Sequence, residues 1–235
     1  MNRDETIGVG FDVDHTIAID NKLERVAFLR LLEFVAKDGG RRVDGLENEI
    51  QRIDELLERQ RDGSFSIDEA VRRFVAERGV SGRDDFYVET FRTMALEMVD
   101  QFVIPLPEAQ RTFSALRARG VRIAVLSNGW NPLQVRKARR VGFDAVVLAS
   151  GDIGARKPNR RAFEALIAAL GTPPERTWYV GDDPLADIEG ARQAGLNAVW
   201  MDAENATFPP ELRAPLHTIH ALDEILELVA AGTRG

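Results

Sequence analysis

The second half of the chain alternates between short apolar runs and helical patterns, and this alternation most constrains the fold. Strands separated by single helices require parallel βαβ units. The sequence therefore predicts an α/β fold with a doubly wound parallel sheet. The expected strands are residues 121–126, 145–149, 178–180, 197–201 and 217–219, and the expected helices are residues 107–119, 132–141, 160–170, 185–194 and 222–230.

An additional strand is expected near the N-terminus, where residues 7–11 alternate between apolar and small side chains. It has no strand partner nearby in the sequence, so it most simply joins the same sheet. The intervening residues 18–103 show helical spacing throughout, with no strand among them. We therefore expect a core domain formed by residues 1–17 and 104–235, interrupted by an inserted all-helical cap domain at 18–103.

Composition narrows the classes of partner. The 235 residues carry a formal net charge of -7, which argues against nucleic acid as the main partner. The absence of cysteine excludes disulfides, thiolate metal sites and cysteine nucleophiles. No segment resembles a signal peptide or a membrane span, so we expect a cytoplasmic protein without a membrane partner. The sequence leaves monomer or homodimer open.

Two acids, Asp12 and Asp14, directly follow the first predicted strand. Ligands bind at the carboxyl ends of strands in open α/β sheets, and two close like charges are poorly suited to a structural role. A solvated acidic turn is the simplest alternative. A calcium loop would need Gly at Ile17 and Glu at Leu23, and a dinucleotide-binding turn would need Gly at Val13.

Three further groups of polar residues follow predicted strands or precede helices. Ser127 and Asn128 could hold phosphate oxygens, although Ser-Asn-Gly is also an ordinary turn. Lys157 could be an ordinary solvated lysine, but a cation before a helix opposes the helix dipole. The third group exceeds what one helix cap requires, and with Asp12 and Asp14 it would form a carboxylate cluster suited to Mg²⁺. Its members are Asp182, Asp183 and Asp187.

Each of these groups alone is weak evidence of a functional site, but their order along the chain is informative. The series D-x-D-x-T, S-N, K-P and G-D-x-x-x-x-D resembles the four motifs of the haloacid dehalogenase-like hydrolase superfamily. The resemblance extends over the whole chain, and the helical insertion resembles that of the helical-cap branch. His15 stands where many helical-cap relatives have Gly.

The resemblance implies a division of labour between the first two acids. Asp12 would be the nucleophile that forms an aspartyl-phosphate. Asp14 would be the general acid/base that protonates the leaving alcohol and then activates water.

The resemblance also implies the residues that bind metal and phosphate. Mg²⁺ would be held by Asp12, Asp182, Asp187 and the backbone carbonyl of Asp14, with Asp183 as a lower-ranked candidate. The expected phosphate-binding residues are Thr16, which would also hold its own loop, Ser127, Asn128 through its backbone amide, and Lys157.

The expected function is a Mg²⁺-dependent phosphomonoesterase that acts on a small phosphorylated metabolite. A dehalogenase is disfavoured, because that chemistry does not need the acid at position 14. A phosphomutase of the beta-phosphoglucomutase type would keep every motif and remains the enzymatic alternative. A phospho-ligand sensor is a third possibility, although a binding protein would not need both a nucleophile and an acid.

Overall fold

The computed structural model describes residues 6–41, 45–61, 63–203 and 205–232. The chain divides into two compact units. One is formed by Met1–Asp20 and Ile104–Gly235, and the other by Asn21–Val103.

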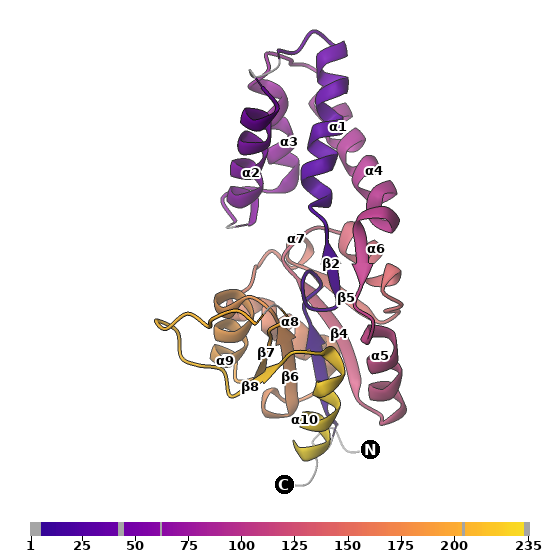
Figure 1. Ribbon diagram of the computed structural model, residues 1–235, viewed down its shortest axis with the longest axis vertical. Helices are drawn as coiled ribbons and strands as arrows, with labels where there is room; N and C mark the ends of the chain where they lie inside the picture. The colour runs from indigo at the N-terminus through magenta and orange to yellow at the C-terminus, as the bar shows by residue number, and fades with distance from the viewer. Residues whose placement is uncertain (1–5, 42–44, 62, 204, 233–235) are drawn as a thin grey trace. The chain divides into compact units, whose positions relative to one another are not determined.

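The first unit contains a six-stranded sheet in the order β5-β4-β1-β6-β7-β8, and all its pairs are parallel. The N-terminal strand lies inside the sheet, between two strands that come much later in the chain (Figure 1). This arrangement confirms the predicted fold class. The strands are β1 (Gly8–Phe11), β4 (Arg122–Ser127), β5 (Val146–Ala149), β6 (Thr177–Gly181), β7 (Asn197–Met201) and β8 (His217–Ile219).

Helices follow the strands of this unit much as the sequence predicts. The expected helix at 185–194 begins as a π-helical segment, η3 (Pro184–Glu189), and continues as α9 (Gly190–Gln193). The other helices are α5 (Ala109–Ala118), α6 (Leu133–Arg140), α7 (Ser150–Ile153), α8 (Arg160–Leu170) and α10 (Ile225–Gly232), with short 3-10 turns at Pro174–Arg176 and Leu222–Glu224.

Close packing explains why β1 contains glycine. A Cβ atom at Gly10 would lie only 2.5 Å from a methyl group of Leu166 on α8 and 2.9 Å from the ring of Tyr179 on β6. Tyr179 in turn packs edge-on against Phe163, with 5.1 Å between ring centroids. The glycine therefore brings α8 against the sheet, and this packing holds the carboxyl end of β1 in place.

The second unit is an all-helical bundle with its own aromatic core. The ring of Phe28 packs, tilted, against Phe74 and Phe91, with 5.0 and 4.5 Å between ring centroids. Ser66 caps the third helix by accepting a hydrogen bond from the backbone N–H of Glu69. The helices are α1 (Leu23–Lys37), α2 (Leu46–Arg61), α3 (Ile67–Ala76) and α4 (Asp84–Phe102).

The prediction that residues 18–103 contain no strand is wrong at both ends. Strands β2 (Ala18–Asp20) and β3 (Val103–Pro105) pair as a separate two-stranded sheet. Three residues are too few to establish a period, and each strand is stabilised by a partner that lies far away in the sequence.

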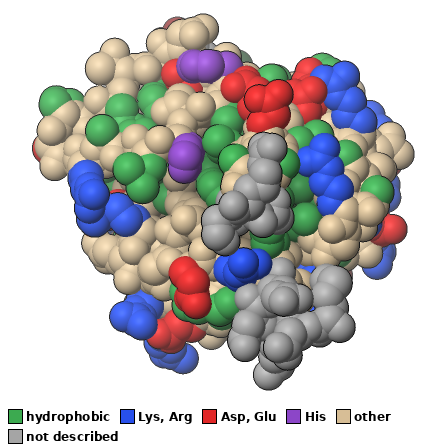
Figure 2. All heavy atoms as spheres, turned by 90° about the horizontal axis from the view of Figure 1, so that it is seen from below, with side chains coloured by type: hydrophobic (Ala, Val, Ile, Leu, Met, Phe, Trp, Pro, Cys, Tyr) green, Lys and Arg blue, Asp and Glu red, His purple; other side chains and the backbone are tan. Residues whose placement is uncertain are grey.

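Among the described residues, no helix is long and apolar enough to cross a membrane. One face of the molecule has acidic and basic side chains interspersed with apolar ones (Figure 2).

Candidate active site

The carboxyl ends of the central strands bring the predicted motifs together. Phe11 pairs with Val125 of β4 and Val180 of β6, and the backbone N–H of Asp12 donates to the Val180 carbonyl at 2.9 Å. The residue that follows β1 therefore lies beside the ends of both neighbouring strands. Ser127 is the buried last residue of β4.

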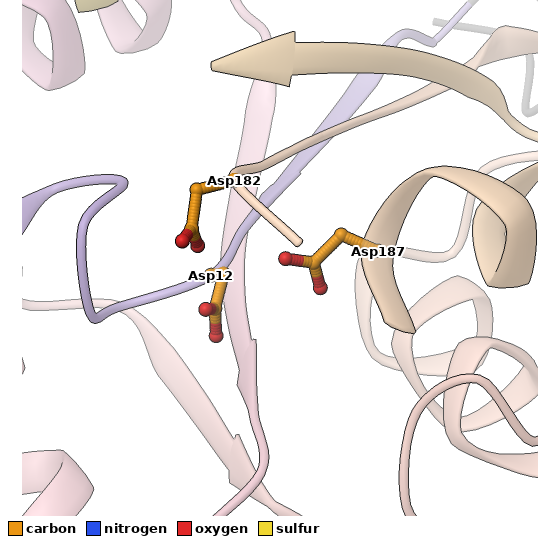
Figure 3. A group of neighbouring side chains, drawn as sticks. All are labelled: Asp12, Asp182 and Asp187. Atoms are coloured by element: carbon orange, nitrogen blue, oxygen red, sulfur yellow. The ribbon is translucent and has the colours of Figure 1, made fainter. Parts of the chain in front are cut away.

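Three of the predicted acids form a cluster at this edge. Each of Asp12, Asp182 and Asp187 offers a carboxylate oxygen, and these oxygens lie within 4.8 Å of one another (Figure 3). Gly181 makes room for the third member, because a Cβ atom there would lie 2.3 Å from the Asp187 carboxyl carbon. The glycine of the G-D-x-x-x-x-D motif is thus required by the approach of its last acid.

Lys157 is the buried cation of this cluster. Its Nζ lies 2.8 Å from Asp12 Oδ1, 2.6 Å from Asp187 Oδ1 and 3.0 Å from the hydroxyl of Tyr179. The side chain of Asn128 holds the lysine's backbone from both sides, donating to its carbonyl at 3.0 Å and accepting from its N–H at 2.9 Å. The S-N and K-P motifs are therefore linked directly.

Burial and mutual repulsion raise the affinity of the acids for protons. Burial, followed by the charges of Asp12 and Asp187, raises the pKa of Asp182 from 3.8 to about 8. Burial also raises the pKa of Asp187 to about 7, although Lys157 opposes the shift. Burial by itself would lower the pKa of Lys157, but Asp12 and Asp187 raise that pKa well above its ordinary value.

The cluster fits a divalent cation. Its three carboxylates and one lysine leave a formal charge of two negative, and all three acids offer oxygen donors, which Mg²⁺ prefers. The buried Oδ1 of Asp12 also has no hydrogen-bond partner with good geometry. A cation would offset the repulsion that raises the pKa values of Asp182 and Asp187.

The carboxylate of Asp14 lies outside this cluster. Lys137 on α6 contacts it with Nζ at 2.9 Å from Oδ1 and 3.0 Å from Oδ2, and the same Nζ lies 2.5 Å from Asp20 Oδ2. Burial raises the pKa of Asp14, and although Lys137 opposes this shift, the pKa stays above its ordinary value.

The other predicted residues have definite places. Thr16 is buried, and its hydroxyl donates to Asp182 Oδ1 at 3.3 Å, so its hydrogen bond orients an acid of the cluster. Asp183 caps η3 by accepting from the backbone N–H groups of Leu185 and Ala186, both at 2.8 Å, and it is not part of the cluster. The third acid of the cluster is therefore Asp187 rather than Asp183.

Sequence reasoning missed two residues that contact the predicted site. Tyr179 has the sequence context of an ordinary aromatic residue in a strand, and nothing in the sequence indicates that its hydroxyl contacts Lys157. Lys137 carries a signal: it follows Leu133 by four residues, so it lies on the buried face of its helix. A lysine on such a face calls for a carboxylate partner.

The parallel sheet and its carboxyl-edge cluster define a Rossmann-like α/β protein with a candidate divalent-cation site. Comparison with protein families is more specific. The model for haloacid dehalogenase-like hydrolases matches residues 8–195. The chain belongs to this family, which confirms the resemblance seen in its motifs.

Curated relatives match part of the chain. Phosphoserine phosphatase of Thermus thermophilus is 40% identical over 114 residues, which are 46% of this chain and 46% of that protein. Pyrimidine 5'-nucleotidase YjjG of Escherichia coli is 34% identical over 130 residues, 53% of this chain and 56% of that protein. The chain thus spans about half the length of the curated relatives it matches.

Solved structures share the whole fold. A 2-haloacid dehalogenase from Pseudomonas syringae has a TM-score of 0.74 at 24% identity, covering 97% of this chain and 99% of that one. The HAD-hydrolase YfnB from Bacillus subtilis, bound to magnesium, has a TM-score of 0.67 at 21% identity, covering 97% and 100%.

Proposed function

We propose that this protein is a Mg²⁺-dependent phosphomonoester hydrolase that acts on a small phosphorylated metabolite through an aspartyl-phosphate. The observation that carries the proposal is the position of Asp12, which lies at the end of a central strand, 2.8 Å from a buried lysine and within a cluster of acids. Similarity to a phosphoserine phosphatase and a nucleotidase supports phosphate as the common element.

In the first half-reaction, a carboxylate oxygen of Asp12 attacks phosphorus and the bond from phosphorus to the leaving oxygen breaks. Asp14 gives its proton to that oxygen, which departs as an alcohol. Lys157 offsets negative charge on the phosphoryl group and on the nucleophile, which is what phosphoryl transfer mainly demands.

In the second half-reaction, water attacks phosphorus and the bond to Asp12 breaks. Asp14 accepts the proton from that water and returns to its starting state. Inorganic phosphate leaves, so atoms and protons balance over the cycle.

The remaining residues would bind Mg²⁺ and orient the phosphoryl group. Mg²⁺, when bound, would neutralise phosphoryl charge, held by Asp12, Asp182, Asp187 and the backbone carbonyl of Asp14. Ser127 and the backbone amide of Asn128 would donate to phosphoryl oxygens. We propose that residues 18–103 act as a cap domain on the 1–17 and 104–235 core and set substrate choice.

Phosphate release from a panel of sugar phosphates, nucleotides, phosphoserine and phosphoglycolate tests this function, with Mg²⁺ and with chelator. We expect the wild type to release phosphate only with Mg²⁺, and Asp12→Asn to lose at least about a thousandfold in rate. Asp144→Asn is the matched control, since its exposed carboxylate pairs with Arg117 at the surface and is not part of the acid cluster. Full activity of Asp12→Asn would refute the nucleophile assignment.

The intermediate has its own test. Borohydride reduces an acyl phosphate to an alcohol, so turnover followed by borohydride should convert residue 12 to homoserine, detectable by peptide mass spectrometry. Interconversion of isomeric sugar phosphates without phosphate release would favour the phosphomutase. Binding of phosphorylated ligands without any turnover would favour the sensor.

A further inference from the structure

The buried lysine on α6 has no part in the steps above, yet it contacts the residue assigned to proton transfer. Lys137 exposes only 2% of its side chain, and its ammonium group lies between the carboxylates of Asp14 and Asp20. Lysine is almost never fully buried without a carboxylate partner. Asp14 and Asp20 supply carboxylate partners of this kind.

The geometry of this trio is directional. Both oxygens of Asp14 lie within 3.0 Å of the Lys137 Nζ, so the carboxylate group is directed toward this nitrogen. Asp20, at the end of β2, lies 2.5 Å from the same nitrogen and anchors it from a second side. Lys137 itself extends from a helix whose buried face includes Leu133 and Ala138.

Asp14 needs such support because its side chain is only partly buried. It retains 34% exposure, whereas Asp20 retains 13%. A partly exposed carboxylate samples several rotamers unless a partner holds it. Proton transfer requires that the acid lie within hydrogen-bond reach of the leaving oxygen, so loss of orientation costs rate.

We propose that Lys137 is a positioning residue that holds the Asp14 carboxylate in the orientation needed for proton transfer. The inference rests on the proposed function, because it assigns proton transfer to Asp14. It predicts a defect that depends on the leaving group. An alkyl alcohol must receive a proton as it departs, whereas p-nitrophenolate leaves as an anion.

The test is kcat/KM for an alkyl phosphate and for p-nitrophenyl phosphate, since kcat/KM reports steps up to departure of the leaving group. We expect Lys137→Met to lower kcat/KM for the alkyl phosphate about tenfold more than for the aryl phosphate. Asp14→Asn should show the same preference more strongly, and Lys137→Arg should recover part of the loss.

Asp20→Asn is the matched control. This variant weakens the anchor of Lys137 but leaves both contacts from Lys137 to Asp14. It should therefore lower kcat/KM for the two substrates to a similar, small extent. If Lys137→Met is poorly folded, Lys137→Gln provides the same measurement with a polar side chain that is uncharged and one atom shorter, so it loses the ammonium contact to Asp14 and the same preference is expected.

Equal losses on the two substrates in Lys137→Met or Lys137→Gln would overturn the inference while leaving the proposed function intact. An equally large leaving-group preference in Asp20→Asn would also overturn the inference, because this variant retains the Lys137–Asp14 contacts, and the preference would then not depend on them. Absence of Mg²⁺-dependent phosphate release by the wild type would instead refute the proposed function and the inference together.

Discussion

At the scale of single residues, the buried acids of the site require a positive charge nearby. Among the described residues, Lys157 pairs with both Asp12 and Asp187, at 2.8 and 2.6 Å. Removing one member of a buried ion pair leaves an uncompensated charge, which is more costly than removing the pair. The lysine therefore supports the fold locally as well as the proposed chemistry.

Replacing Lys157 with Met should separate these two roles. We expect kcat to fall by roughly 10²–10³, as when one preorganised donor to a transition state is removed. Mg²⁺ binding, followed by calorimetry, should persist because the three acids remain. Lys37→Met, at an exposed position of α1, should keep wild-type kcat. Retention of wild-type kcat by Lys157→Met would contradict the proposed role of the lysine.

Much of the site could be predicted at the residue scale, because its motifs are local. Contacts between loops could not. The side chain of Asn128 bonds to the backbone of Lys157, 29 residues further along, and no feature of either loop specifies this pairing. Lys137 was missed because its partner Asp14 is 123 residues away. Folding brings such pairs together through the packing of α6 and α8 on the sheet.

At the scale of elements, η3 combines a helix cap with a proposed metal ligand. Asp183 accepts two backbone hydrogen bonds at the start of η3, while Asp187, one turn later, points into the acid cluster. The backbone N–H of Asp183 also donates to Asp187 Oδ2 at 3.1 Å. Asp183 therefore stabilises the start of η3, and this local structure places the Asp187 carboxylate in the acid cluster.

Single substitutions of Asp183 and Asp187 should have different effects, one on stability and the other on Mg²⁺ binding. Asp183→Ala should lower the free energy of unfolding by about 1 kcal/mol through loss of the cap, with Mg²⁺ affinity little changed. Asp187→Asn should weaken Mg²⁺ binding at least about tenfold. Chemical unfolding and calorimetric Mg²⁺ titration measure the two quantities. A larger loss of Mg²⁺ affinity in Asp183→Ala would reverse the assignment.

The long elements follow from the sequence, whereas the short ones do not. Helix α8 and strand β7 begin and end where their patterns predict. Strands β2 and β3 and helix α7 have three or four residues each, so pairing and packing rather than periodicity decide their conformation.

At the scale of the whole molecule, alternation of strands and helices predicts a parallel sheet but leaves the strand order open. The sequence indicates only that β1 joins the sheet. Its place between β4 and β6 is what puts Asp12 beside both Ser127 and Asp182. The site is therefore a consequence of sheet topology, and its stability is linked to that of the folded core.

This linkage predicts how stability depends on pH and Mg²⁺. The pKa values of Asp182 and Asp187 rise from 3.8 to about 8 and about 7 in the folded protein. Between pH 4 and 8 the folded state then binds more protons at these acids than the unfolded chain does. Stability of the metal-free protein should accordingly fall as pH rises through this window. Asp182→Asn should flatten that slope.

Mg²⁺ should oppose the trend, because it binds the ionised acids of the folded state and competes with protons. At a concentration one hundred times its Kd, it should stabilise the fold by about 2.7 kcal/mol, which corresponds to roughly 5–10 °C in Tm for a chain of this size. The gain should be larger at pH 8 than at pH 6. Thermal melts with Mg²⁺ or chelator at both pH values measure it, with Asp144→Asn as the control that keeps the wild-type response. A gain in Tm that is equal at both pH values, or equal in Asp182→Asn and the wild type, would mean that the cation binds elsewhere.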